Sequence, residues 1–258
     1  MKTFLNYIVT LFIGLYFIFG CEFNNGPQNK KYTHSLLFNL VVNETRQEFY
    51  IYKIVKDEDV NDFEGKSPDI YFEKGANIIL YNSDLNYNSF VLKKLSNTYT
   101  TARNLFYSNS ESLKLNTNTK YNIDISINGN IITGSTTTPS DFNIITPTPN
   151  STFRLNDLRN GAGINIKWEK SSSAKGYIGK IFIHKGNNDI SKESPFITLD
   201  TTFNWNESSS TGKAVINIYA FDKNYYKHFI DLSQSAGIKG AYGYFGSSIK
   251  KSVTVNIE

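Results

Sequence analysis

Alternating apolar and polar residues mark the second half of the chain as β-structure. In four runs an apolar side chain occupies every second position: residues 164–168, 181–183, 214–220 and 253–257. Successive side chains of a strand point to opposite faces of its sheet, so this spacing predicts strands that bury one face. Helical spacing is scarce, and only residues 224–234 allow a short helix.

The first half carries the same signal and one clear hairpin. Three runs are typical of strands: residues 35–42, 48–55 and 77–81. Further on, apolar residues from Tyr121 to Ile127 alternate with polar ones up to the dipeptide Asn128-Gly129. Asn tolerates positive φ and Gly adopts it freely, as the favoured two-residue turn requires. The chain should therefore fold back into a strand over residues 130–133.

A proline-rich stretch separates the two halves. Residues 136–150 hold three of the six prolines and end one strand-rich region before another begins. Each half has the size of an immunoglobulin-like sandwich. We therefore expect an all-β fold with two tandem immunoglobulin- or fibronectin III-like β-sandwich domains, residues 32–145 and residues 150–258.

The N-terminal residues have the pattern of a secretion signal. Lys2 precedes an apolar run that extends to Gly20, and a charged start followed by an apolar centre is typical of a signal peptide. We expect residues 1–20 to be this signal. The alternative is a membrane anchor, because the run is at the lower limit of length for a membrane-spanning helix. Residues 21–31 are polar and should form a flexible tether.

The residues Ile18-Phe19-Gly20-Cys21 resemble the lipobox of bacterial lipoproteins. The resemblance implies that a signal peptidase recognises Ile18, Phe19 and Gly20, and that the Cys21 thiol carries a diacylglycerol after cleavage. Acyl chains contribute about 0.8 kcal/mol per buried methylene, enough for several chains to hold a protein on a membrane. Alternatively, Cys21 is an inert apolar residue. By resemblance to known lipoproteins, Glu22 favours the outer membrane.

Composition and motifs exclude several classes of function. The 27 Lys and Arg residues are scattered and the net charge is +4, so nucleic acid is not an expected partner. His34, His184 and His228 form no metal-binding pair and no nucleophile elbow is present, so we expect no metal, cofactor or catalytic residue. The acidic residues 57–64 do not fit EF-hand spacing, and calcium binding by this loop stays open.

Aromatic residues near the C-terminus are the candidate binding residues. They are Tyr225, Tyr226, Tyr242, Tyr244 and Phe245. Ring faces stack on sugars or peptides, and tyrosine is common at interfaces because it combines apolar area with a polar tip. The alternative is that these rings fill the core, since small sandwiches without disulfides need large side chains inside.

Trp168 and Tyr177, followed by the run Ile216–Asp222, resemble the fibronectin type III pattern, which implies that both rings lie between two sheets. Ala214 departs from that pattern, since the family usually has a core tyrosine there.

Over the whole mature length, the chain resembles a Bacteroidota lipoprotein family of unknown function. The resemblance rests on the lipobox, on Gly75–Leu80 and Thr119–Ile123, on a Thr-rich strand that ends at Pro139, and on Tyr242–Ser247. It implies an outer-membrane lipoprotein, often encoded beside TonB-dependent transporters, and it supplies no catalytic residues.

We therefore expect a lipid-anchored protein of the bacterial cell envelope that is not an enzyme. It should act as a binding or accessory component, with an outer-membrane transporter or another envelope protein as its partner. The alternatives are an envelope enzyme acting on glycan or peptide and a structural or adhesive spacer. The sequence leaves open any small-molecule ligand, the oligomeric state, and whether the protein faces the periplasm or the cell surface.

Overall fold

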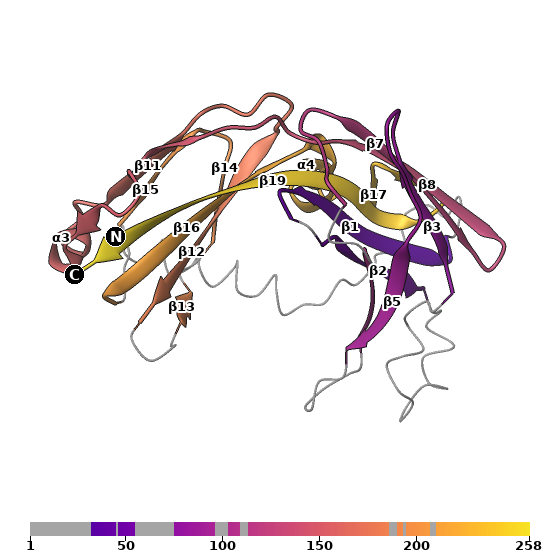
Figure 1. Ribbon diagram of the computed structural model, residues 1–258, viewed down its shortest axis with the longest axis horizontal. Helices are drawn as coiled ribbons and strands as arrows, with labels where there is room; N and C mark the ends of the chain where they lie inside the picture. Colours follow the sequence, from indigo (N-terminus) through magenta and orange to yellow (C-terminus); the bar gives the residue numbers. More distant parts are fainter. Residues whose placement is uncertain are drawn as a thin grey trace, which may run out of the picture. The chain divides into compact units, whose positions relative to one another are not determined.

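Strands dominate the computed structural model, which describes residues 32–44, 46–54, 75–95, 103–108, 113–185, 190–192, 195–206 and 210–258 (Figure 1). The two helices of the described residues are short: α3, Leu155–Arg159, and α4, Lys223–Phe229. The predicted all-β fold is confirmed. The predicted signal peptide, lipobox and tether and the acidic residues 57–64 lie outside the described residues.

The largest sheet of the described residues has eleven strands. Its main path is β13 (Ile190–Lys192), β12 (Gly176–His184), β16 (Gly212–Phe221), β19 (Tyr242–Ile257), β1 (His34–Val42), β2 (Glu48–Lys53), β6 (Arg103–Ser108) and β5 (Phe90–Leu95). Three further strands pair beside this path: β10 (Thr152–Phe153), β14 (Phe196–Thr198) and β17 (Ser235–Ala236).

Strand β19 joins the two ends of this sheet. Its residues 242–249 pair in parallel with β1, and its residues 248–257 pair antiparallel with β16. In Figure 1 β19 is the long yellow strand that continues from β1 to β16. One uninterrupted strand therefore serves both halves of the chain.

Two smaller sheets cover the large one. The three-stranded sheet has the order β15 (Thr202–Trp205), β11 (Ile164–Trp168) and β9 (Ile144–Thr146). The five-stranded sheet has the order β18 (Ile238–Lys239), β8 (Asn130–Thr137), β7 (Lys120–Ile127), β3 (Asn77–Tyr81) and β4 (Asn86–Tyr87). Between the described strands, each pair of facing sheets encloses one hydrophobic core.

The C-terminal core has the arrangement that the fibronectin III resemblance implies. It lies between β12, β16 and the end of β19 on one side and the three-stranded sheet on the other. Trp168 and Tyr177 are both buried, with ring centroids 5.3 Å apart in an edge-to-face contact. The apolar residues of β16 that alternate in the sequence, Ala214 included, are buried as well.

The N-terminal core draws residues from both halves of the chain. Phe38 of β1 and Ile123 of β7 lie in it, and so do Ile238 of β18 and Phe245 of β19. The predicted domain limits, 32–145 and 150–258, stay a prediction, but core membership does not follow them. The physical reason is the length of β19, because 16 residues at about 3.3 Å each reach along both sandwiches.

Local signals in the sequence correctly located two smaller features. Asn128 and Gly129 have φ of 47° and 77°, and Ile127 pairs with Asn130, so the β7–β8 hairpin has the predicted turn. Helix α4 falls inside the ambiguous stretch 224–234 apart from its first residue, Lys223. Its N-cap is Asp222, whose side chain accepts a hydrogen bond from the Tyr225 N–H.

Candidate binding groove

The predicted binding aromatics do not form one exposed surface. Phe245 is fully buried in the N-terminal core, 5.3 Å from the Phe38 ring. Tyr244 is only 6% exposed and contacts the rings of Tyr225 and His228 of α4 at 5.8 and 5.2 Å. Core packing, the alternative weighed from the sequence, thus accounts for both residues.

The remaining three candidates are partly buried. Tyr225 packs on Phe221 at 4.9 Å, Tyr226 lies under the ammonium group of Lys175, and Tyr242 contacts the Tyr32 ring edge-on at 5.1 Å. Their faces are therefore engaged within the protein, which leaves little ring area to stack on a ligand.

The histidines are as dispersed in space as in sequence. His34 is 4% exposed inside β1, and His184 is exposed at the end of β12. His228 stacks on Tyr244, and its Nδ1 lies 2.9 Å from the Ser233 carbonyl oxygen. Among the described residues, no three His, Cys, Asp or Glu side chains gather as a metal site would require.

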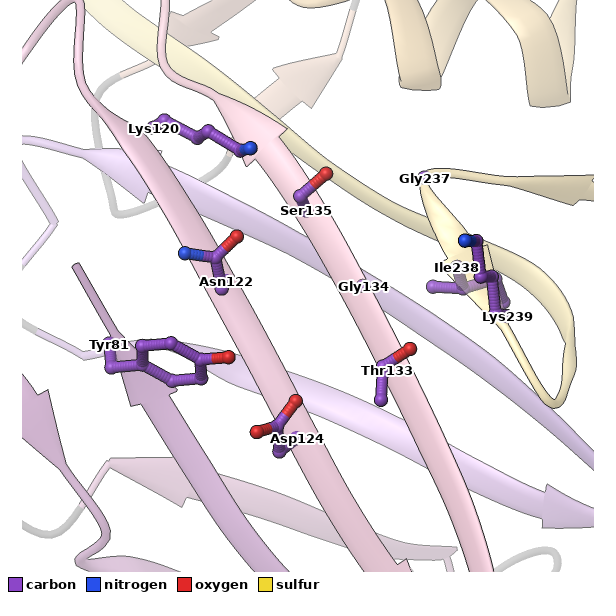
Figure 2. A pocket seen from close by; sticks show the side chains of 10 residues that line it. All are labelled: Tyr81, Lys120, Asn122, Asp124, Thr133, Gly134, Ser135, Gly237, Ile238 and Lys239. Carbon is purple, nitrogen blue, oxygen red and sulfur yellow. The ribbon is translucent and has the colours of Figure 1, made fainter.

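A groove of about 480 Å³ on the outer face of the five-stranded sheet offers a different candidate site (Figure 2). We name it the β7–β8 groove. Its lining residues are Tyr81, Lys120, Asn122, Asp124, Thr133, Gly134, Ser135, Gly237, Ile238 and Lys239.

Strand alternation explains the polar floor of the β7–β8 groove. In β7, the core residues Tyr121 and Ile123 alternate with Lys120, Asn122 and Asp124, which point outward. The register of β7 and β8 then places Asn122 opposite Ser135 and Asp124 opposite Thr133. Figure 2 shows these side chains in two neighbouring rows along the sheet.

Strand β18 forms the wall of the groove, and glycines allow it to lie close to β8. The Ser135 N–H donates a hydrogen bond of 2.8 Å to the Gly237 carbonyl. A Cβ atom at Gly134 would lie 2.7 Å from that same oxygen, so any larger residue would displace β18. This approach sets Lys239 beside Thr133, to which it is paired.

The charged groups of the groove differ in whether they have a partner. Partial desolvation raises the pKa of Tyr81, and the nearby Asp124 carboxylate, which accepts a hydrogen bond from the Tyr81 hydroxyl, raises it further. The Tyr81 hydroxyl thus stays protonated at neutral pH. Lys120 and Lys239 form no ion pair with any described residue. Among the described residues, the groove therefore has two ammonium groups without an ion-pair partner and one carboxylate that interacts with Tyr81.

Nothing in the sequence pattern pointed to the β7–β8 groove. The outward residues of β7 are the polar half of an alternating pattern, which is normally the solvated face of a sheet. The missing information was the position of Lys239, because the pairing of β18 with β8 joins segments that are distant in the sequence.

Comparisons with known proteins place the chain in no family. No family model and no curated protein matches it. The predicted membership in a Bacteroidota lipoprotein family therefore stays a prediction. Among the described residues, no helix combines the length and hydrophobicity needed to cross a bilayer.

Solved structures with distant similarity include tandem immunoglobulin and fibronectin domains. The chain is similar to the two immunoglobulin domains of DIP-gamma, with 8% identity and a TM-score of 0.22 over 87% of this chain and 97% of that one. It is also similar to the first three fibronectin domains of chicken CNTN1, with 11% identity and a TM-score of 0.26 over 90% and 69% of the two chains. For a tetra-tandem repeat of a large adhesion protein, the identity is 11% and the TM-score 0.24 over 88% and 50%. Because these TM-scores are low, the fold assignment rests on the strand pairing and the two cores described above.

Proposed function

We propose that this chain is a lipid-anchored, non-enzymatic protein of the bacterial cell envelope that binds a ligand in the β7–β8 groove. The observation that carries the proposal is the groove itself: a concave site of about 480 Å³ with polar groups from four strands. This volume lies within the range of about 300–1,000 Å³ that is typical of small-molecule sites. The lipobox-like residues that end at Cys21 support the anchoring.

The side chains in the groove favour binding over catalysis. Hydrolysis of a glycosidic bond normally requires two carboxyl groups, and Asp124 is the single carboxylate among the lining residues. Acyl transfer requires a nucleophile next to a base, and no histidine lines the groove beside Thr133 or Ser135. The groove thus offers hydrogen-bonding groups without a catalytic pair.

An accessory role beside an outer-membrane transporter is part of this proposal. It is supported by the resemblance of the whole mature chain to envelope lipoproteins. Pull-down of the acylated protein from envelope fractions in mild detergent should recover a transporter or another envelope protein. Recovery of the protein alone would count against the accessory role.

Cysteine replacement tests the anchor. Cys21→Ser should leave the precursor uncleaved or release the protein into the soluble fraction, because the lipid is attached through a thioether to the thiol sulfur, which serine lacks. Mass spectrometry of the mature N-terminus measures the attached lipid directly. Normal processing and unchanged membrane partitioning of the variant would contradict lipidation.

A spacer function is the second candidate, favoured by the continuity of β19 through both cores. The two functions differ in what they require of the groove. A binding component should lose its partner or ligand when groove side chains are replaced, whereas a spacer should tolerate such changes as long as the fold is retained.

A further inference from the structure

We infer that the β7–β8 groove binds a saccharide that carries an acidic group. This inference rests on the proposed binding function, since it names the ligand class of the same site. It follows from three properties of the groove: its polarity, its one accessible ring and its excess of positive charge.

The polarity of the groove disfavours an apolar ligand. Of the ten lining residues, Ile238 is the one with an aliphatic side chain, and it is only 8% exposed. Binding energy for an apolar molecule comes from buried apolar area, and the lining residues include no cluster of apolar side chains. A ligand rich in hydroxyl groups is a better match, because Asn122, Thr133 and Ser135 offer amide and hydroxyl groups that both donate and accept hydrogen bonds.

Tyr81 provides the one aromatic ring among the described residues that line the groove. In Figure 2 this side chain extends from β3 toward Asn122 and Asp124 of β7. Its hydroxyl interacts with the Asp124 carboxylate by hydrogen bonding and charge. A saccharide ring has a face of C–H groups that packs on an aromatic ring while its hydroxyls reach polar neighbours, and tyrosine suits such mixed contacts.

The charge of the groove selects for an anion. Lys120 extends from β7 in the floor of the groove and Lys239 from β18 in its wall, so the two ammonium groups come from different strands (Figure 2). Neither has an ion-pair partner among the described residues, and Asp124 is occupied by Tyr81. A carboxylate or sulfate on the saccharide would accept charge-assisted hydrogen bonds from these lysines, and such bonds are stronger than neutral ones.

Titration calorimetry with matched probes tests the inference. The protein is the acylated full chain in detergent micelles, and the probes are an oligogalacturonate, its carboxyl-reduced neutral counterpart and a sulfated heparin-derived oligosaccharide. We expect at least one acidic probe to bind and the neutral counterpart to bind at least about tenfold more weakly, with affinity falling as salt rises. The two acidic probes distinguish a carboxylate from a sulfate as the recognised group.

Paired lysine variants locate the binding. Lys120→Gln combined with Lys239→Gln should weaken acidic-probe binding by at least about tenfold, since two charge-assisted contacts are lost. The control combines Lys167→Gln with Lys170→Gln, two exposed lysines of the C-terminal sandwich outside the groove, and should bind as the unchanged protein does. Equal weakening in both double variants would indicate non-specific charge attraction and overturn the inference.

Envelope pull-down separates failure of the ligand class from failure of the proposed function. If no saccharide binds, but an envelope partner is captured by the unchanged protein and lost with the Lys120/Lys239 double variant, the saccharide inference is wrong and the binding function stands. If the double variant also captures its partners normally, the groove is no binding site and both proposals fail.

Discussion

The buried carboxylate of Asp222 ties helix α4 to the sheets beneath it, and its removal should destabilise the protein measurably. Asp222 is only 2% exposed. One oxygen accepts a hydrogen bond of 2.9 Å from the Tyr225 N–H, and the other accepts one of 2.5 Å from the Thr136 hydroxyl of β8. Thr136 in turn lies 2.9 Å from the Ser247 hydroxyl of β19.

The expected cost of Asp222→Ala follows from these contacts. Loss of the N-cap hydrogen bond costs about 0.5–2 kcal/mol, and loss of a buried hydrogen bond to a charged group costs about 1.5–3 kcal/mol. The variant also no longer has the free-energy cost of burying the carboxylate, and this gain offsets part of the loss. We therefore expect the free energy of unfolding to fall by about 2–4 kcal/mol.

Asp222→Asn separates the capping role from the charge. The remaining carbonyl oxygen can still accept from Tyr225, and the amide nitrogen can donate to Thr136, whose hydroxyl then donates to Ser247. The bond between residue 222 and Thr136 is then reversed in direction, while Ser247 can keep donating to the Thr137 carbonyl. We expect a loss of about 1 kcal/mol or less, the typical net value of one altered hydrogen bond.

The stability of the unchanged protein and that of Asp222→Asn should also depend differently on pH. Burial raises the pKa of Asp222 above its ordinary value of 3.8, against the opposing effect of its hydrogen bonds. In this case the folded state binds more protons than the unfolded state, so this group's contribution to stability is full below pH 3.8 and declines as pH rises through the folded pKa. Asp222→Asn lacks this decline, so it should gain stability relative to the unchanged protein as pH increases from 3.8 upward.

Urea unfolding followed by tryptophan fluorescence measures both effects, because Trp168 and Trp205 are buried in the C-terminal core. At each pH, the free energy of unfolding of the unchanged protein is subtracted from that of Asp222→Asn. The other titrating groups contribute equally to both proteins, so their effect cancels in this difference. A loss of less than about 0.5 kcal/mol in Asp222→Ala, the usual range of a surface substitution, would contradict a stabilising role for the Asp222 hydrogen bonds. A difference between the unchanged protein and Asp222→Asn that stays constant with pH would refute the pKa argument.

Two further predictions test the C-terminal core and the hairpin. Trp168→Ala should cost about 3–5 kcal/mol, whereas Trp168→Phe should cost distinctly less, because the buried indole N–H has no hydrogen-bond partner to lose; equal thermal shifts would contradict this. Gly129→Ala should cost about 1–2 kcal/mol because its φ is +77°, while the control Gly75→Ala, which has open space around it, should leave the urea midpoint unchanged. A similar loss in both variants would contradict the turn argument.

Local periodicity made much of the fold predictable from the sequence. Alternation identifies a strand and its buried face without knowledge of its partner, as it did for the strands that contain Trp168, Ile216 and Ile123. The Asn128-Gly129 turn was equally visible because positive φ is a property of the residues themselves. Each of these features depends on residues that are close in sequence.

Features that depend on distant pairing were beyond such reasoning. Strand β18 has two residues, too few for any periodic signal, yet it places Lys239 at the groove. The role of the aromatic candidates also depends on contacts between segments that are distant in the sequence. A tyrosine cluster is compatible with either a binding face or a core, and only the position of α4 over Tyr244 decides between them.

The construction of the groove has a consequence for how binding and folding are linked. Its floor comes from β7 and β8, whereas its wall comes from β18, which is followed by β19 and so continues into the C-terminal core. Any ligand that contacts both Lys120 and Lys239 therefore bridges segments from the two halves of the chain. Such a ligand binds only when β18 is docked on β8, so by linkage it must stabilise that docking. Asn224, which donates hydrogen bonds to the carbonyls of Ser135 and Phe245, holds the same junction from the side of α4. Weakening this junction should therefore lower ligand affinity without altering any side chain that lines the groove.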